Sequence, residues 1–142
     1  MTTVRKLFEG ALALLDAGDV DGFVGCFEPD GEFVHPQAAV EGPEQIRAFI
    51  GMSVRAFPDG HHELRDVLED GDTVVVAGDW TGTHTGPLPT PAGELPGTGR
   101  QVRVSFAALA RIHDGRIRRA QVYSDQLAFM AQLGLLPTPA TD

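Results

Sequence analysis

Residues 100–124, with the sequence RQVRVSFAALARIHDGRIRRAQVYS, decide the fold of this protein. Residues 100–112 predict one long strand, and residues 116–124 predict a second one. Between them, His113-Asp114-Gly115 is a tight-turn signal of the kind that joins antiparallel strands. The stretch therefore predicts a long β-hairpin.

The residues that precede this hairpin predict more antiparallel strands. Residues 62–69 alternate around apolar side chains, Asp70-Gly71-Asp72 is a second turn signal, and residues 73–85 are a β-branched run. Residues 86–99 are rich in glycine and proline, so we expect a loop there. The second half of the chain therefore predicts a meander of long strands.

The first half of the chain and its last residues predict helices. In residues 4–17 the apolar side chains recur three and four positions apart, which is the spacing of a helix with one buried stripe. We expect helices over residues 4–17, 20–27, 43–56 and 125–134, a turn at residues 29–31 and a short strand over residues 32–36. This order indicates the α+β class, with N-terminal helices packed on one face of a curved, mostly antiparallel sheet. Such a sheet encloses a cavity in which a ligand can bind.

Composition and charge limit the possible partners. The length of 142 residues predicts a single domain over residues 1–142, with a frayed tail at residues 138–142. The formal net charge of −9 should repel nucleic acid and anionic membranes. There is neither a signal-peptide pattern nor an apolar run of the ~20 residues that span a bilayer, so we expect a cytoplasmic protein.

The histidines, the cysteine and the glycines show no pattern of a metal or phosphate site. His61 and His62 are adjacent, so on a strand they would point to opposite faces and could not easily share one metal ion. Cys26 has apolar neighbours that indicate a small buried side chain. The glycines of residues 86–99 lack the spacing of a phosphate-binding loop. We therefore expect no bound metal.

One polar face is predicted at the end of the last strand. Asp125 stands where the strand gives way to an amphipathic segment, and it is our first candidate for a proton carrier. Gln121 and Tyr123 project from the same face, because side chains alternate along a strand. The alternative is that Asp125 is the N-cap of the helix that follows, which suits its residue type equally well.

A second group of candidates comes from two earlier strands. Trp80 and His84 share one face of the strand over residues 73–85, while His35 precedes the proline that ends the first strand. His84 is a candidate for catalysis, Trp80 for binding of the substrate, and His35 for a base near the cavity mouth. The alternatives are a structural, hydrogen-bonded His84 and a Trp80 that belongs to the core.

Four motifs carry a resemblance to a known family. They are residues 17–21 with 26–30, residues 42–47, residues 80–86 with 97–100, and residues 114–117 with Asp125 and residues 132–134. With these motifs the chain resembles the SnoaL-like polyketide cyclases of the NTF2-like superfamily. The resemblance implies a cone-shaped α+β barrel, a homodimer, and chemistry without metal or cofactor. It also implies that Asp125 matches the family's acid/base aspartate, although Gln121 and Ala120 stand where relatives often carry a His-Trp pair.

The resemblance and the candidate residues together predict a function. We expect a cofactor-free cyclase or isomerase that acts on a polyketide-like or other hydrophobic carbonyl compound in an internal pocket. Asp125 would remove a proton next to a carbonyl, and His84, Tyr123 or Gln121 would donate to the enolate oxygen. Trp80, Tyr123, Gln121 and His35 would bind the substrate. The alternatives are a non-catalytic small-molecule binding protein on the same scaffold and a cofactor-free polyketide hydroxylase.

Overall fold

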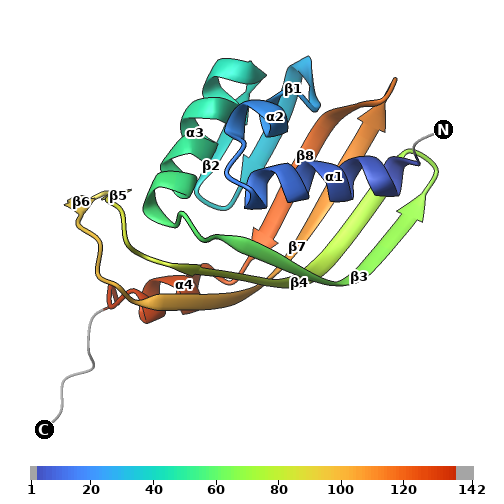
Figure 1. Ribbon diagram of the computed structural model, residues 1–142. Helices are drawn as coiled ribbons and strands as arrows, with labels where there is room; N and C mark the ends of the chain where they lie inside the picture. The colour runs from blue at the N-terminus through green and yellow to red at the C-terminus, as the bar shows by residue number, and fades with distance from the viewer. Residues whose placement is uncertain (1–2, 137–142) are drawn as a thin grey trace, which may run out of the picture.

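A curved six-stranded sheet with helices on its concave side makes up the computed structural model of this protein, which describes residues 3–136 (Figure 1). The predicted α+β class, with a mostly antiparallel sheet, is confirmed. The expected frayed tail at residues 138–142 lies outside the described residues.

The sheet has the strand order β2-β1-β8-β7-β4-β3. Its strands are β1 (Phe27–His35), β2 (Ala38–Glu41), β3 (His61–Asp70), β4 (Thr73–Thr83), β7 (Gln101–His113) and β8 (Arg116–Ser124). Neighbouring strands are antiparallel except for β1 and β8, which are parallel. The predicted hairpin of β7 and β8 is therefore present, and it lies in the middle of the sheet.

The helices are α1 (Val4–Asp16), α2 (Val20–Val24), α3 (Gly42–Ala56) and α4 (Gln126–Gln132). The first three cover the concave face of the sheet, and α4 lies beside β7 at the other end (Figure 1). The side chains of Thr3 and Asp19 cap α1 and α2 by accepting from Lys6 N and Gly22 N. Pro43 occupies the first turn of α3, where its missing N–H costs nothing.

Two segments differ from the sequence prediction. The expected turn at residues 29–31 falls within β1, at the bulge between Phe27 and Glu32 where the register with β8 shifts. The expected loop at residues 86–99 contains a small hairpin of β5 (Leu88–Thr90) and β6 (Gly93–Leu95).

A bulge in β8 decides which side chains face the helices. Ile117 pairs with Ile112, but Arg119 pairs with Arg111, so β8 carries one extra residue at this point. Ile117 is buried, and beyond the bulge the inward positions are the even ones, beginning with the buried Ala120. A single extra residue thus exchanges the two faces of the rest of the strand.

Candidate functional site

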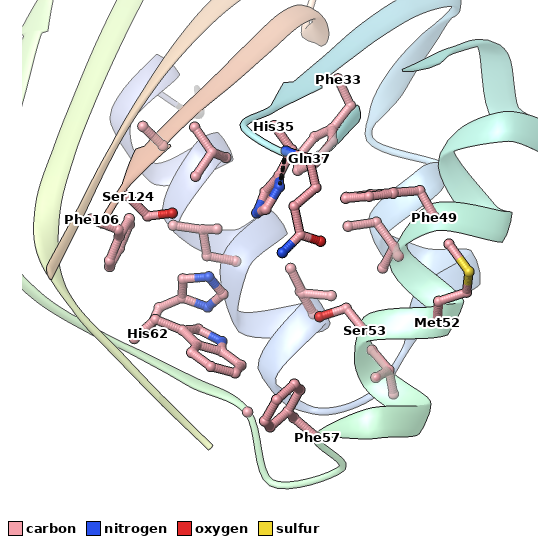
Figure 2. Close-up of a pocket in the computed structure, with 18 of the residues that line it drawn as sticks. Phe33, His35, Gln37, Phe49, Met52, Ser53, Phe57, His62, Phe106 and Ser124 are labelled. Atoms are coloured by element: carbon pink, nitrogen blue, oxygen red, sulfur yellow. Dashed lines mark hydrogen bonds between the residues drawn. The ribbon is translucent and has the colours of Figure 1, made fainter. Parts of the chain in front are cut away.

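A cavity of about 180 Å³ lies between the sheet and the helices (Figure 2). Every phenylalanine except Phe27 lines it, together with Trp80, the only tryptophan. The exposed residues Met52 and Gln37 lie on its border, so the cavity opens to solvent on that side. The walls are therefore mainly apolar and rich in aromatic rings, as in sites for flat organic ligands.

His62 and Asp16 form a hydrogen-bonded pair in the wall of the cavity. The Nδ1 atom of His62 lies 2.6 Å from Oδ1 of Asp16, and the backbone N–H of His62 donates to Oδ2 over 3.1 Å. An ionised carboxylate only accepts hydrogen bonds, so Nδ1 of His62 carries a proton, and in the neutral imidazole Nε2 is then the nitrogen with the lone pair. Between residues 3 and 136 no group bonds to that Nε2. His62 is therefore oriented as a base.

His35 lies in the cavity wall with the opposite tautomer. Its Nδ1 accepts a hydrogen bond from the backbone N–H of Gln37 over 3.2 Å, so Nε2 carries the proton. The rings of Phe33 and Phe49 lie beside the imidazole, with centroid distances of 6.4 and 5.2 Å. Burial lowers the pKa of His35 to about 4, so the ring is neutral at pH 7 and donates through Nε2.

Figure 2 shows His35 and His62 projecting into the same cavity from different strands. Nε2 of His35 offers an N–H, and Nε2 of His62 offers a lone pair when that imidazole is neutral. A base and a hydrogen-bond donor on one cavity are the two groups needed to form and hold an enolate. Asp16 adds a negative charge that would stabilise the imidazolium once His62 takes up a proton.

A short chain of polar side chains runs along the cavity. Gln37 Nε2 donates to Oε1 of Gln126 over 2.8 Å, and Gln126 Nε2 donates to Oγ of Ser124 over 2.8 Å. All three residues line the cavity, and Figure 2 shows Gln37 and Ser124 among its walls. The chain connects the turn after β1 with the start of α4, and it supplies polar groups to a surface that is otherwise apolar.

The residues predicted from the sequence divide into two groups. Trp80 and His35 line the cavity, as a binding role requires. Gln121 and Tyr123 do not: they lie on the outer face of the sheet, where Tyr123 is 55% exposed. The extra residue in β8 is the reason, because it places Val122 and Ser124 on the cavity side instead.

Asp125 and His84 also lie outside the cavity lining. Asp125 is exposed and is the N-cap of α4, since its Oδ1 accepts from the backbone N–H of Ala128 over 2.9 Å. His84 is fully buried; its Nδ1 lies 2.9 Å from Oγ1 of Thr98, and its ring lies 5.4 Å from that of Phe57. These contacts are those of a helix cap and of a histidine that fastens the segment around Thr98 to β4.

Sequence reasoning missed the pair of His62 and Asp16. One signal was available: Asp16 is the last residue of α1, where the helix dipole disfavours a negative charge. A carboxylate in that position calls for a compensating partner, and the structure supplies His62, with His61 Nδ1 at 3.2 Å from Oδ2. Between residues 3 and 136 no group of three or more His, Cys, Asp or Glu side chains is arranged to hold a metal ion.

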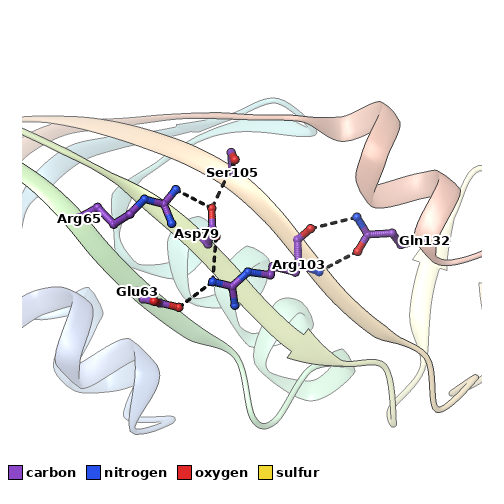
Figure 3. Close-up of polar contacts among 6 residues, drawn as sticks. All are labelled: Glu63, Arg65, Asp79, Arg103, Ser105 and Gln132. Carbon is purple, nitrogen blue, oxygen red and sulfur yellow. Dashed lines mark hydrogen bonds and ion pairs between the residues drawn. The ribbon is translucent and has the colours of Figure 1, made fainter.

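On the outer face of the sheet, Asp79 is the centre of a charged cluster (Figure 3). It accepts hydrogen bonds from Arg65 over 2.8 Å and from Ser105 over 3.3 Å, and it forms an ion pair with Arg103 at 3.0 Å. Arg103 also contacts Glu63 at 2.9 Å. The hydrogen bond from Arg65 is the main reason that the pKa of Asp79 falls to about 2.

The same region fastens α4 to the sheet. The pairing of β8 with β7 ends at Ser124 and Phe106, which leaves the backbone of Arg103 without a partner strand on that side. Gln132 of α4 fills this place: its Oε1 accepts from Arg103 N over 2.7 Å, and its Nε2 donates to Arg103 O over 2.9 Å (Figure 3). Phe129 of the same helix is thereby held against the cavity.

Comparison with known proteins agrees with this architecture. The sequence matches the family model of the SnoaL-like domain over residues 4–120. Comparison with curated proteins gives no match. Within the described part of the chain, no helix is long and apolar enough to cross a membrane.

Solved structures share the fold over nearly the whole chain. A SnoaL-like protein from Jannaschia sp. CCS1, described as a candidate polyketide cyclase, is 25% identical with a TM-score of 0.78, over 96% of this chain and 98% of that one. AclR from Streptomyces galilaeus, described as a candidate hydroxylase, is 21% identical with a TM-score of 0.79, over 94% and 97%. IdmH from Streptomyces antibioticus, described as a candidate polyketide cyclase, is 22% identical with a TM-score of 0.77, over 94% and 99%. The resemblance and the fold predicted from the sequence are confirmed.

Proposed function

The chain belongs to the SnoaL-like domain family, and on this premise we propose that it is an acid/base catalyst that acts on a hydrophobic carbonyl compound, as a cyclase or an isomerase. The observation that supports the proposal most is the opposite protonation of two histidines on one cavity. His62 presents a lone pair at Nε2, and His35 presents an N–H at Nε2.

In the proposed reaction, His62 removes a proton from the carbon next to a carbonyl group. The electrons of the C–H bond move into the enolate, whose oxygen accepts a hydrogen bond from His35. Asp16 stays ionised and stabilises the protonated His62. In a cyclase, the enolate carbon then attacks a second carbonyl of the same molecule: a C–C bond forms, the C=O π bond breaks, and the new alkoxide oxygen takes the proton back from His62. In an isomerase, His62 returns its proton to a different carbon.

The low pKa of His35 suits this role. A histidine that stays neutral above its pKa of about 4 donates a hydrogen bond without placing a second positive charge beside protonated His62. A neutral donor also adds no charge of its own to the cavity before the substrate binds. His35 thus replaces His84 and Tyr123 as the proposed donor, and His62 replaces Asp125 as the proposed base.

The experiment measures proton abstraction directly. It needs no knowledge of the natural substrate. Exchange of the α-protons of a neutral aryl ketone in deuterated water is followed by NMR with wild type, His62→Gln and Asp16→Asn. A positioned general base contributes roughly 10²- to 10⁴-fold, so His62→Gln should lose most of the catalysed exchange. Asp16→Asn should lose less of the catalysed exchange, because His62 is still present but a carboxylate no longer fixes the proton on its Nδ1.

Tyr123→Phe is the matched control, since Tyr123 lies on the outer face, and it should exchange at the wild-type rate. A folded His62→Gln variant with undiminished exchange would refute the assignment of the base. Binding of the ketone without any exchange in wild type would favour the alternative, a small-molecule binding protein on the same scaffold.

We also propose that the protein is a homodimer that uses the outer face of its sheet. This face carries apolar side chains in register: Val75 pairs with Leu109, and Ala107 pairs with Tyr123. Leu68 and Tyr123 are 67% and 55% exposed. Exposed apolar side chains that adjoin on one sheet face are typical of an interaction surface.

A further inference from the structure

The walls of the cavity indicate which class of compound it binds. We infer that the ligand is a neutral, planar compound of one or two rings, with a carbonyl between His35 and His62 and a second hydrogen-bonding group at Gln37 and Gln126. The position of the carbonyl rests on the proposed function. The size, the charge and the second polar group of the ligand follow from the cavity alone.

The volume limits the number of rings. An apolar cavity of roughly 150 Å³ holds one benzene ring. The cavity of this protein measures about 180 Å³ and has an open side, so one ring fits inside and a second one extends toward the opening. Eight of the enclosing side chains are those of phenylalanine or tryptophan, and aromatic rings favour stacked and edge-on contacts with a flat ligand. A compound with three or more fused rings exceeds this space.

The charges around the cavity exclude an anionic ligand. Of the residues that the structure describes, no lysine or arginine lines the cavity. The carboxylate there, Asp16, is negative, and His35 is neutral because burial lowers its pKa to about 4. A ligand carboxylate would therefore lose its hydration without gaining a cation, which is costly. The formal net charge of −9 acts in the same direction over longer distances.

The second polar group of the ligand is placed by the chain of Gln37, Gln126 and Ser124. The amides of Gln37 and Gln126 meet at the open side of the cavity, and Gln37 is exposed. Side chains that already bond to each other at the surface can change partners at little cost, because both states keep their hydrogen bonds. A ligand hydroxyl that reaches this side can therefore bond to Gln126.

The test compares four probes by isothermal titration calorimetry, with the fluorescence of Trp80 as a second readout of binding inside the cavity. The probes are acetylnaphthalene, hydroxyacetylnaphthalene with its hydroxyl on the far ring, naphthoate and acetylanthracene. Acetylnaphthalene should bind at least about tenfold more tightly than naphthoate and acetylanthracene. Naphthoate binding as tightly as the ketone would overturn the inferred neutrality, and equal binding of acetylanthracene would overturn the inferred size.

The hydroxyl group tests Gln126. In wild type it should improve affinity about fivefold, which is the value of one net hydrogen bond. Gln126→Ala should remove this gain, measured as the ratio of the two affinities within the same variant, whereas the control Gln101→Ala on the exposed end of β7 should keep the gain. A gain that survives in Gln126→Ala would overturn the second polar contact. If only the proposed function is wrong, the wild-type protein does not exchange the α-protons of the ketone, although the four probes bind in the stated order of affinity.

Discussion

Acid should destabilise this protein through His35, and replacing that residue should remove the effect. In the folded protein, burial holds the pKa of His35 at about 4, whereas an unfolded histidine titrates near ~6.5. Between these pH values the unfolded chain binds a proton at this position and the folded chain does not. The contribution to stability is therefore fully present above about pH 6.5 and is lost as the pH falls toward 4.

The magnitude follows from the two pKa values. Each pH unit between them corresponds to about 1.4 kcal/mol, so a fall from 6.5 to about 4 amounts to about 3 kcal/mol once the pH reaches 4. At pH 5 the expected loss is about 2 kcal/mol by the same relation. Small domains have a total stability of roughly 5–15 kcal/mol, so this loss is a large part of it.

The assay is urea unfolding of wild type and His35→Gln at pH 7 and pH 5. We expect the free energy of unfolding of wild type to fall by about 2 kcal/mol more than that of the variant between these values. Other acid-sensitive groups affect both proteins equally and cancel in the comparison. An equal pH dependence in wild type and His35→Gln would refute the reasoning.

Three further substitutions test the other structural assignments. Asp125→Ala should lower the free energy of unfolding by about 1 kcal/mol through loss of the α4 cap, while Asp125→Asn should retain it. Ketone exchange should be unchanged in both variants, and loss of exchange in both would return Asp125 to a catalytic role. Gly78→Ala should lower the free energy of unfolding by at least about 2 kcal/mol in urea unfolding, since the new Cβ on β4 would clash with the backbone oxygen of Glu63 on β3; a neutral effect would contradict this close approach. Leu109→Arg should convert a dimer to a monomer in analytical ultracentrifugation, whereas the exposed α4 variant Leu127→Arg should not; an unchanged dimer in Leu109→Arg would exclude this face.

Local patterns were sufficient to predict most of the elements. The helical spacing of residues 4–17 and the turn signals at Asp70-Gly71-Asp72 and His113-Asp114-Gly115 lie where α1 and the two main hairpins are found. These features depend on neighbours within a few residues, so they can be recognised in the sequence alone. The place of residues 29–31 within β1 could not be predicted, because the bulge that they form is defined by the pairing of Phe27 and Glu32 with β8.

Local patterns did not decide which face of β8 points into the cavity. Simple alternation places Gln121, Tyr123 and Asp125 together, and Gln121 and Tyr123 are indeed on one side of β8, whereas Asp125 follows the strand as the N-cap of α4. The bulge at the pairing of Arg111 with Arg119 turns that side outward. Nothing in the local sequence marks this bulge, since it is defined by the partner strand.

The sequence by itself determined the α+β class, the order of the elements and the membership of the SnoaL-like domain family, because these follow from periodicity, turn residues and motifs along the chain. Only the tertiary structure decided which polar side chains share the cavity. His62 and Asp16 are 46 residues apart and meet because α1 lies across the end of β3. The protonation of His35 and His62 depends on such partners and on burial, and neither property is encoded locally.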